Sequence, residues 1–278
     1  MIKKLTIETA SRQGYVVIDS MVREAIAESG VQNGICVISL DEDAGGLGLT
    51  STWDLGGMDD MVNELWRCVP PRVTYLHQRS PIAAAAHTRS VFTSCSYSIV
   101  VKEGQPLAGH SQSFVLFEFD GPETRNLTLS VVEAPFYYEV FQFDSYFNEI
   151  HDITDCVRTA VKNSGYKNGF CHLTVVAATA GIAMCPTGSE RQQDIVEDFD
   201  RLITTRADFN HRESAYDPSG HIKTCISGTQ LNVPFENGGL LLGEESCLCY
   251  AEFDGPRPRD VRICVFKDEA GHSIQSQT

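Results

Sequence analysis

The spacing of apolar positions predicts helices and strands in a definite order along the chain. Residues 20–28 place their apolar side chains on one helical face, and Gly30 follows as the residue that lets the chain leave a helix in a left-handed turn. Residues 34–40 form an apolar run of strand length. The pattern therefore predicts a helix and then a strand, which leads into the acidic, glycine-rich residues 41–46.

The pattern also predicts two more helices farther along the first half of the chain and several strands on either side of the helices. One helix covers residues 58–68, and the next begins at Ser80-Pro81, where a capping oxygen precedes a proline suited to the first helical turn. The other predicted strands are residues 5–9, 15–18, 97–101, 113–119 and 127–132. Because helices are interspersed with strands and several strands follow one another, we expect an α+β fold with a mixed β-sheet packed with helices.

The glycine-rich run Gly45-Gly46-Leu47-Gly48 resembles a phosphate-binding loop only in part. It lacks the lysine and the serine or threonine of a P-loop, and its glycines do not have the spacing of a dinucleotide-binding fingerprint. We therefore predict a turn at this run and no nucleotide site.

The same pattern occurs twice in the chain. Residues 22–30 return as residues 157–165, and the segment Glu118–Pro122 returns as Glu252–Pro256. Solenoid repeats run to roughly 20–50 residues, and this period is far longer. The sequence therefore predicts a duplicated domain.

The duplication predicts how the domains are organised. We expect one domain in residues 1–134, a second in residues 135–270 and a flexible tail in residues 271–278. A chain of 278 residues fits two domains of about 100–200 residues each. The second copy has Asp217-Pro218 where the first has Ser80-Pro81, and this predicts that Asp217 caps the corresponding helix.

Charge and cysteine content narrow the class of protein. The formal net charge of −15 argues against a nucleic-acid partner and against binding to an anionic membrane surface. No apolar stretch reaches the about 18 residues of a membrane span, and the first residues lack the apolar core of a signal peptide. We therefore expect a cytoplasmic protein whose ten cysteines are reduced and mostly buried.

Two histidines keep their spacing in both copies. His77 and His87 return as His211 and His221. Histidine can transfer protons near neutral pH and is a common metal ligand, so all four are candidate catalytic residues. A single histidine is more often structural than functional, and this alternative stays open for each of them.

Charged residues recur beside these histidines. Arg89 and Lys223 each follow a helix histidine by two residues and keep a positive charge there. Arg72 and its counterpart Arg206 could bind phosphate, or they could pair with carboxylates of the second helix. Those carboxylates lie four residues apart in each copy: Asp60 and Glu64 in the first, Asp194 and Asp198 in the second.

Each copy resembles the YjbQ-like family, small single-domain proteins labelled secondary thiamine-phosphate synthases. In the first copy the motifs that carry the resemblance are Tyr75-Leu76-His77, Ala86-His87-Thr88-Arg89-Ser90 and Glu118-Phe119-Asp120-Gly121-Pro122. In the second they are Phe209-Asn210-His211, Gly220-His221-Ile222-Lys223-Thr224, Leu240-Leu241-Leu242-Gly243 and Glu252-Phe253-Asp254-Gly255-Pro256-Arg257. The resemblance covers nearly the whole chain and implies a compact α+β domain in each copy.

The chain departs from the family where a His-Thr-Thr-Ala signature is expected. The signature histidine falls on Glu42 in the first copy and on Ala177 in the second, so the signature is degenerate in both. The resemblance implies that this histidine joins the other two around a metal or a phosphate. The first copy could still assemble Glu42, His77 and His87 around a divalent ion such as Zn²⁺ or Mg²⁺. The second copy lacks the third ligand, so the first is the better candidate.

Three hypotheses of function follow. The resemblance implies a metal- or histidine-assisted reaction on a small phosphorylated molecule, of the thiamine-phosphate synthase type. In this hypothesis Arg89, Arg72 and Lys223 would bind the substrate. The alternative is a non-catalytic duplicated domain that serves as a binding or assembly module. In the third, each copy lends groups to one site between them, so that the chain acts as a homo-oligomer or pseudo-oligomer.

Overall fold

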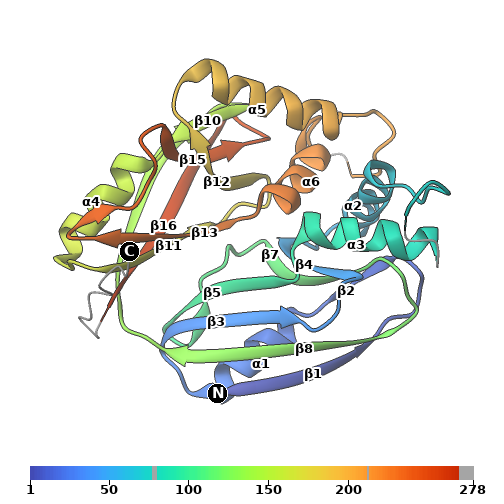
Figure 1. Cartoon of the computed structure of the whole chain (residues 1–278), viewed down its shortest axis with the longest axis horizontal. Helices are drawn as coiled ribbons and strands as arrows, with labels where there is room; N and C mark the ends of the chain where they lie inside the picture. Colours follow the sequence, from blue (N-terminus) through green and yellow to red (C-terminus); the bar gives the residue numbers. More distant parts are fainter. Residues whose placement is uncertain (77–79, 212, 269–278) are drawn as a thin grey trace.

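The computed structural model describes residues 1–76, 80–211 and 213–268. The chain forms two domains, and the blue-to-green first copy lies below the yellow-to-red second copy in Figure 1. At the predicted boundary between them, the amide of Ala134 donates to the carbonyl of Asn33 at 3.1 Å. His77 and the predicted tail 271–278 lie outside the described residues.

The six helices of the described residues follow the predicted order. They are α1 (Asp19–Ser29), α2 (Leu55–Cys68) and α3 (Pro81–Thr93) in the first copy, and α4 (Thr154–Ser164), α5 (Ser189–Leu202) and α6 (Asp217–Ser227) in the second. Gly30 and Gly165 end α1 and α4 with φ angles of 71° and 70°, the left-handed conformation that glycine adopts without strain. The Ser80 hydroxyl caps α3 as predicted, accepting from the amide of Ala83 at 3.3 Å.

Each copy contains one five-stranded and one three-stranded sheet with the same strand order. In the first copy the larger sheet runs β1 (Ile2–Glu8), β8 (Thr124–Glu133), β3 (Asn33–Leu40), β5 (Ser96–Lys102), β6 (Gln105–Pro106), and the smaller runs β2 (Gly14–Val17), β7 (Gln112–Glu118), β4 (Gly45–Ser51). In the second copy the larger sheet runs β14 (Gly239–Leu240), β13 (Gln230–Glu236), β11 (Gly169–Val175), β16 (Arg257–Lys267), β9 (Phe136–Ser145), and the smaller runs β10 (Glu149–Asp152), β15 (Ser246–Glu252), β12 (Ala180–Pro186).

The α+β class and the two tandem domains are confirmed, but the prediction of a mixed sheet is wrong. Every strand pair among the described residues is antiparallel. The helical connections explain this result. The strands β2 and β3, which α1 joins, belong to different sheets, and so do β4 and β5, which α2 and α3 join, so the helices do not return the chain to a parallel neighbour.

The glycine-rich run forms part of strand β4 rather than the predicted turn. Its glycines are needed because other groups approach this strand closely. A Cβ on Gly46 would lie 1.8 Å from the Thr93 hydroxyl of α3, and one on Gly48 would lie 2.9 Å from the ring of Phe117. The glycines therefore allow α3 to pack directly on the sheet, and no phosphate loop is present here.

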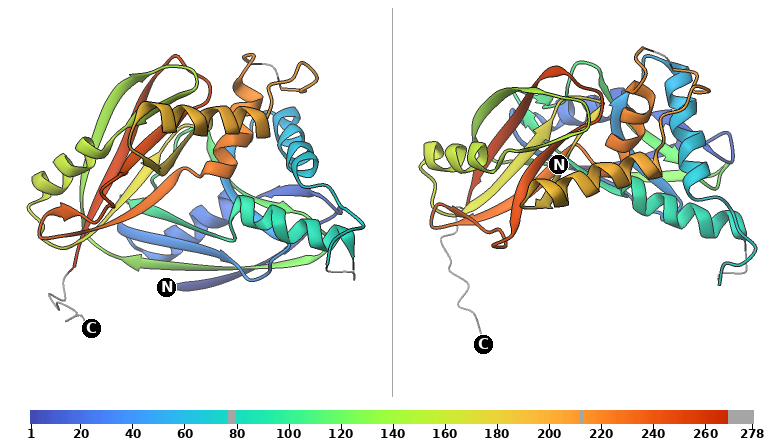
Figure 2. Two further views of the ribbon diagram at one scale, coloured as in Figure 1. Left: turned by 45° about the horizontal axis from the view of Figure 1, so that its top comes forward. Right: turned by 90° about the horizontal axis from the view of Figure 1, so that it is seen from above.

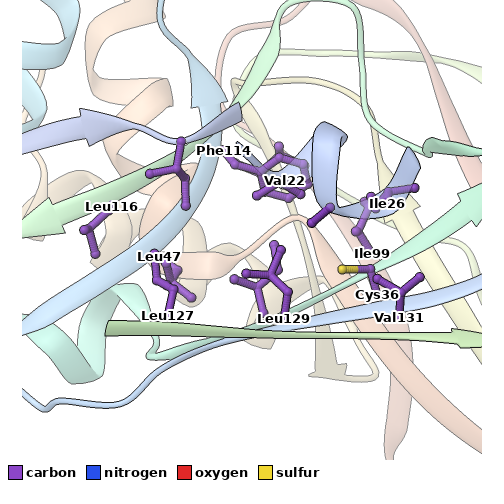
Figure 3. Close-up of a cluster of buried hydrophobic side chains, with 14 of the residues drawn as sticks. Val22, Ile26, Cys36, Leu47, Ile99, Phe114, Leu116, Leu127, Leu129 and Val131 are labelled. Atoms are coloured by element: carbon purple, nitrogen blue, oxygen red, sulfur yellow. The ribbon is translucent and has the colours of Figure 1, made fainter. Parts of the chain in front are cut away.

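The core of the first copy lies between α1 and its sheets. Val22 and Ile26 of α1 point toward Ile99 and Leu129 of the larger sheet (Figure 3). The second copy repeats this arrangement with α4. The repeated motif Glu-Phe-Asp-Gly-Pro is partly structural: the buried Glu118 carboxylate accepts two hydrogen bonds from Arg125, at 2.9 and 2.6 Å.

The two copies share one further hydrophobic cluster at their junction. It joins Met58 and Leu65 of α2 to Ile203, Phe209 and Ile222 of the second copy. In both views of Figure 2 the blue α2 lies beside the orange α6. The contact is head-to-tail, because α2 of one copy packs on α6 of the other. We call this contact the junction.

Candidate functional site

Three side chains of the second copy converge beside the junction. His211 lies in the loop before α6, while Asp217 and His221 lie one turn apart on α6 itself. The Oδ2 atom of Asp217 hydrogen-bonds with Nε2 of His211 and lies 3.2 Å from Nε2 of His221. The three ligand atoms all lie within 4.8 Å of one another, and among the described residues no other group of this kind occurs.

The first copy fixes the orientation of His211. The carboxylate of Asp54, which caps α2 by accepting from the Gly56 amide at 2.9 Å, also hydrogen-bonds with Nδ1 of His211. The buried Asp60 accepts from the backbone amide of His211 at 2.9 Å. Gly57 makes this approach possible, since a Cβ there would lie 3.3 Å from the His211 ring. The site is therefore composite, with groups from both copies.

The second histidine is oriented by its own copy. Nδ1 of His221 lies 3.0 Å from the carbonyl oxygen of Ala178, to which it donates. Both histidines thus use Nδ1 for an orienting hydrogen bond and present Nε2 to the same oxygen of Asp217. Metal-binding histidines in proteins are commonly held in this way, with one ring nitrogen on a carboxylate or carbonyl and the other on the ion.

The charges of the cluster are set by these contacts. Burial lowers the pKa of His211, but its hydrogen bonds with Asp54 and Asp217 outweigh burial and raise it above the ordinary value. Burial raises the pKa of Asp217, yet the hydrogen bonds and charges of His221 and His211 lower it to about 2. Asp217 is therefore ionised at neutral pH, and His211 holds its proton to a higher pH than an ordinary histidine does.

A second buried carboxylate stands next to Asp217. Asp254, from the repeated Glu-Phe-Asp-Gly-Pro motif, accepts from the Ser214 hydroxyl at 2.7 Å and pairs with Arg257 at 2.5 Å. Burial and the nearby charge of Asp217 raise the pKa of Asp254. The motif therefore adds an acid whose charge is sensitive to what occupies the site.

A cavity opens beside the cluster. It has a volume of about 630 Å³, and His211, Arg206, Phe209 and Ser214 are among its lining residues. Pockets for small molecules commonly have volumes of about 300–1,000 Å³, so this one is large enough for a metabolite-sized ligand. Arg206 stacks on Phe209, with 4.9 Å from its guanidinium carbon to the ring centre.

The candidates of the first copy are placed differently. The side chain of His87 is 42% exposed, and its Nδ1 lies 3.1 Å from the carbonyl oxygen of Asp43. The Glu42 carboxylate accepts from the side-chain amide of Asn126 on β8 at 3.1 Å. Since His77 lies outside the described residues, the metal set Glu42, His77 and His87 stays a prediction.

Two of the predicted substrate-binding residues are buried away from the cavity. Arg89 is 1% exposed, donates to the carbonyl of Val69 at 3.1 and 2.9 Å and lies 4.0 Å above the Trp66 ring. Lys223 has no exposed surface, and its ammonium pairs with Asp200. Their roles in substrate binding stay predictions that this geometry does not favour.

The predicted phosphate-binding arginines differ between the copies. Arg206 pairs with Glu64 of α2 at 2.9 Å across the junction, so the alternative of carboxylate pairing applies to it. Arg72, its counterpart, is exposed and lies 4.5 Å from the Tyr75 ring centre. Arg72 remains available to a ligand.

The chain matches one family model over both copies. The model is the UPF0047 protein YjbQ-like family, and it matches residues 3–134 and again residues 139–268. The chain belongs to this family.

Individual relatives correspond to a single copy. A UPF0047 protein of Methanocaldococcus jannaschii is 31% identical over 132 residues, which cover 48% of this chain and 94% of that protein. A UPF0047 protein of Mycobacterium tuberculosis is 28% identical and covers 45% of this chain and 94% of its own length. A crystal structure of a YbjQ-like protein of unknown function from Sulfolobus solfataricus has a TM-score of 0.46 at 24% identity, covering 48% of this chain and 96% of its own. This chain is therefore a tandem duplication of the family domain.

Sequence reasoning missed two residues of the composite site. Asp217 was predicted to cap α6, but its carboxylate turns to the histidines, and its own amide donates to the Ser214 hydroxyl at 3.0 Å. Its position four residues before His221 was the available signal, because side chains at that spacing share a helical face. Asp54 could not be found in this way, since it belongs to the other copy.

In the described part of the chain no helix is both long and apolar enough to cross a membrane.

Proposed function

We propose that His211, Asp217 and His221 bind a divalent metal ion at the junction and that the ion assists a reaction on a small phosphorylated molecule. The observation that supports this most is the shared target of the two Nε2 atoms. Both face one carboxylate oxygen, and both rings are held from behind through Nδ1.

The donor set favours zinc over magnesium. Two imidazole nitrogens and one carboxylate oxygen are a common ligand set of catalytic zinc sites, which keep a further position open. Magnesium prefers an all-oxygen environment with several waters. A bound zinc ion would supply Lewis acidity, polarising a phosphoryl or carbonyl oxygen of the ligand.

The cavity supplies the place for the ligand. Arg206 forms part of its wall and is one-third exposed, although its charge is shared with Glu64 and Asp208. The Ser214 hydroxyl belongs to the same wall. A phosphate group could accept hydrogen bonds from the Arg206 guanidinium, whereas the Ser214 hydroxyl already donates to Asp254 at 2.7 Å.

A non-catalytic function is the second candidate, and one observation favours it. Every ring nitrogen of His211 and His221 already has a protein partner, so the cluster could serve as a clasp that holds the two copies together. The chain would then be a binding or assembly module.

Zinc titration distinguishes the two candidates. Protein stripped with a chelator and titrated by calorimetry should bind one Zn²⁺ per chain, and a His221→Ala variant should not. The affinity should fall as the pH is lowered below neutrality, because His211 must lose the proton that its raised pKa favours. Wild-type protein that binds zinc no better than His221→Ala would leave the clasp as the function of the cluster.

The substrate class needs its own measurement. In the zinc-loaded protein, inorganic phosphate and pyrophosphate should raise the melting temperature in a thermal-shift assay. Arg206→Gln should reduce this increase while zinc binding is retained. Equal stabilisation of both proteins would exclude Arg206 as a phosphate ligand.

A further inference from the structure

Three cysteines of the second copy lie together on the small sheet that α5 covers. Cys185 of β12 stands directly opposite Cys247 of β15, and Cys249 follows two residues later on the same face of β15. The three are buried, with at most 6% of any of them exposed, and Ile150 and Ile195 pack against them. Figure 1 shows α5 running along this sheet of β10, β15 and β12. The thiols therefore share the layer between the sheet and α5.

Cys249 connects the other two thiols. Its Sγ lies 3.4 Å from Sγ of Cys247, and its thiol also donates a hydrogen bond to Cys185. That hydrogen bond lowers the pKa of Cys185 although burial acts to raise it, whereas the pKa of Cys249 is raised. By contrast, burial alone raises the pKa of Cys171, in the core of the same copy, to about 12. The cluster therefore favours a thiolate on Cys185, and thiolates are the form in which cysteine binds metal ions.

The side-chain amide of Gln192 on α5 is directed at two of the sulfurs. Its Nε2 atom lies 3.4 Å from Sγ of Cys247 and 3.8 Å from Sγ of Cys249, and it donates to the carbonyl of Pro186 at 3.0 Å. An N–H group aimed at sulfur stabilises negative charge there, and such outer partners commonly support metal ligands. An apolar side chain would pack on neutral thiols equally well. The amide is therefore the observation that points from packing to a charged, metal-bound sulfur.

The first copy builds the same layer without thiols. Thr50 of β4 stands opposite Ser113 of β7, as Cys185 stands opposite Cys247. The residues of the first copy at the four positions are Thr50, Met58, Ser113 and Val115, of which Met58 of α2 is the counterpart of Gln192. The fold thus packs this layer without cysteine, and the second copy brings three thiols and an amide donor together.

We propose that Cys185, Cys247 and Cys249 bind one Cu(I) ion beneath α5. Thiolates select soft metal ions, and Cu(I) is among the softest that proteins hold. The three sulfurs do not all lie within 4.8 Å of one another, so they are less compact than the histidine cluster at the junction. They therefore suit an ion that two or three sulfurs satisfy rather than zinc, whose structural sites are closed by four ligands. Binding releases thiol protons, and the Gln192 N–H offsets part of the negative charge that remains.

A pocket gives the ion a route to the sulfurs. It has a volume of about 270 Å³, and Gln192, Ile150 and the acidic Glu149 are among its lining residues. Gln192 and Ile150 both line the pocket and contact the cysteines. An ion that enters the pocket therefore reaches the sulfurs once the Gln192 side chain turns aside.

Competition for Cu(I) tests the proposal. Reduced protein, kept free of oxygen, should withdraw one Cu(I) per chain from a chromophoric Cu(I) chelator. The test variants each take the residue of the first copy and are Cys185→Thr, Cys247→Ser, Cys249→Val and Gln192→Met. Cys249→Val should abolish the withdrawal, because it removes the sulfur that contacts both others. The other two cysteine variants should lower the affinity for Cu(I) by more than about 10-fold and Gln192→Met by about 10-fold.

Two controls separate this site from cysteines in general and from the proposed zinc site. Cys171→Val changes another buried cysteine of the second copy, and His221→Ala removes a ligand of the zinc site; both should bind Cu(I) like the wild type. Circular dichroism would verify that each variant is folded, and X-ray absorption of the copper-loaded wild type should show sulfur ligands alone. A wild type that does not compete with the chelator, copper bound through nitrogen or oxygen, a folded Cys249→Val protein that binds like the wild type, or an equal loss in Cys171→Val would each overturn the proposal.

Discussion

The helix histidine of each copy, His87 or His221, lies in different surroundings. In the second copy His221 is 8% exposed and faces Asp217, while in the first the side chain of His87 is 42% exposed and the residue four positions earlier is Ala83. Yet both rings are oriented alike, since each places Nδ1 near a backbone carbonyl oxygen. The fold orients this histidine in both copies. His87 lies 3.5 Å from the exposed carboxylate of Asp43, whereas His221 faces the buried carboxylate of Asp217, which it shares with His211.

The difference also shows how a duplication can make one site out of two. Asp54 and Asp60 of α2 reach across the junction to His211, whereas their counterparts on α5 are Gly188 and the exposed Asp194. Because the junction is head-to-tail, the second copy receives these groups from the first, and among the described residues α5 returns no such group to the first copy. The two copies have therefore diverged into a donor and a receiver of orienting groups.

The largest expected effect comes from replacing Asp217 by alanine, the residue that the first copy has at the equivalent position, Ala83. Asp217→Ala should lower zinc affinity by more than about 100-fold, since loss of an orienting partner alone typically costs 10–100-fold and this change removes a ligand. Competition with a chromophoric chelator would measure it. Asp194→Ala serves as the matched control, and an equal loss in both variants would show that the cluster is not the zinc site.

Stability should separate the two helix carboxylates that occupy equivalent positions. Asp60→Ala leaves the buried His211 amide without a partner and also removes the acceptor of the exposed Asn210 side chain, and it should cost about 1–3 kcal/mol. Asp194→Ala changes an exposed residue and should cost less than about 0.5 kcal/mol. Urea unfolding would measure both. Equal costs would mean that the junction does not depend on Asp60.

A buried histidine of strand β11, His172, should make stability depend on pH. Burial lowers the pKa of His172 to about 4, and its Nδ1 lies 2.8 Å from the Asn232 side-chain oxygen. In the unfolded chain the imidazole of His172 has an ordinary pKa near 6.5, so as the pH falls it is protonated there before it is protonated in the folded protein. The neutral, buried His172 therefore makes its full contribution to the free energy of unfolding above about pH 6.5. This contribution is lost as the pH falls toward 4, and the free energy of unfolding is lower by about 2 kcal/mol at pH 5.

The first copy again supplies the comparison for this histidine. The counterpart of His172 is Val37, which is 36% exposed. His172→Val should flatten the dependence of unfolding free energy on pH between 6.5 and 4, measured by urea unfolding at several pH values. A variant with the wild-type slope would assign that slope to other groups.

Sequence patterns predicted the parts of the fold that depend on local periodicity and on the repeat. The helices beginning at Asp19 and Pro81 were found because apolar spacing, caps and terminal glycines are local signals. Strand β4 was missed because its glycines serve a distant helix, and a glycine-rich run looks like a turn until α3 is placed on it. A site shared between the copies was one of the three hypotheses, but its members could not be named from the sequence, since Asp54 and His211 come from different copies.

The smallest effect tests the orienting role of Asp54, which has no carboxylate counterpart in the second copy. Asp54→Ser keeps an oxygen that can cap α2 but removes the charge that holds Nδ1 of His211. We expect zinc affinity to fall about 10-fold, equivalent to about 1.4 kcal/mol, with the unfolding free energy nearly unchanged. Parallel zinc titrations and urea unfolding of Asp54→Ser and wild type would measure both quantities. Because Asp54 belongs to the first copy and the zinc ligands to the second, a loss of affinity without a loss of stability would show that one copy tunes the chemistry of the other.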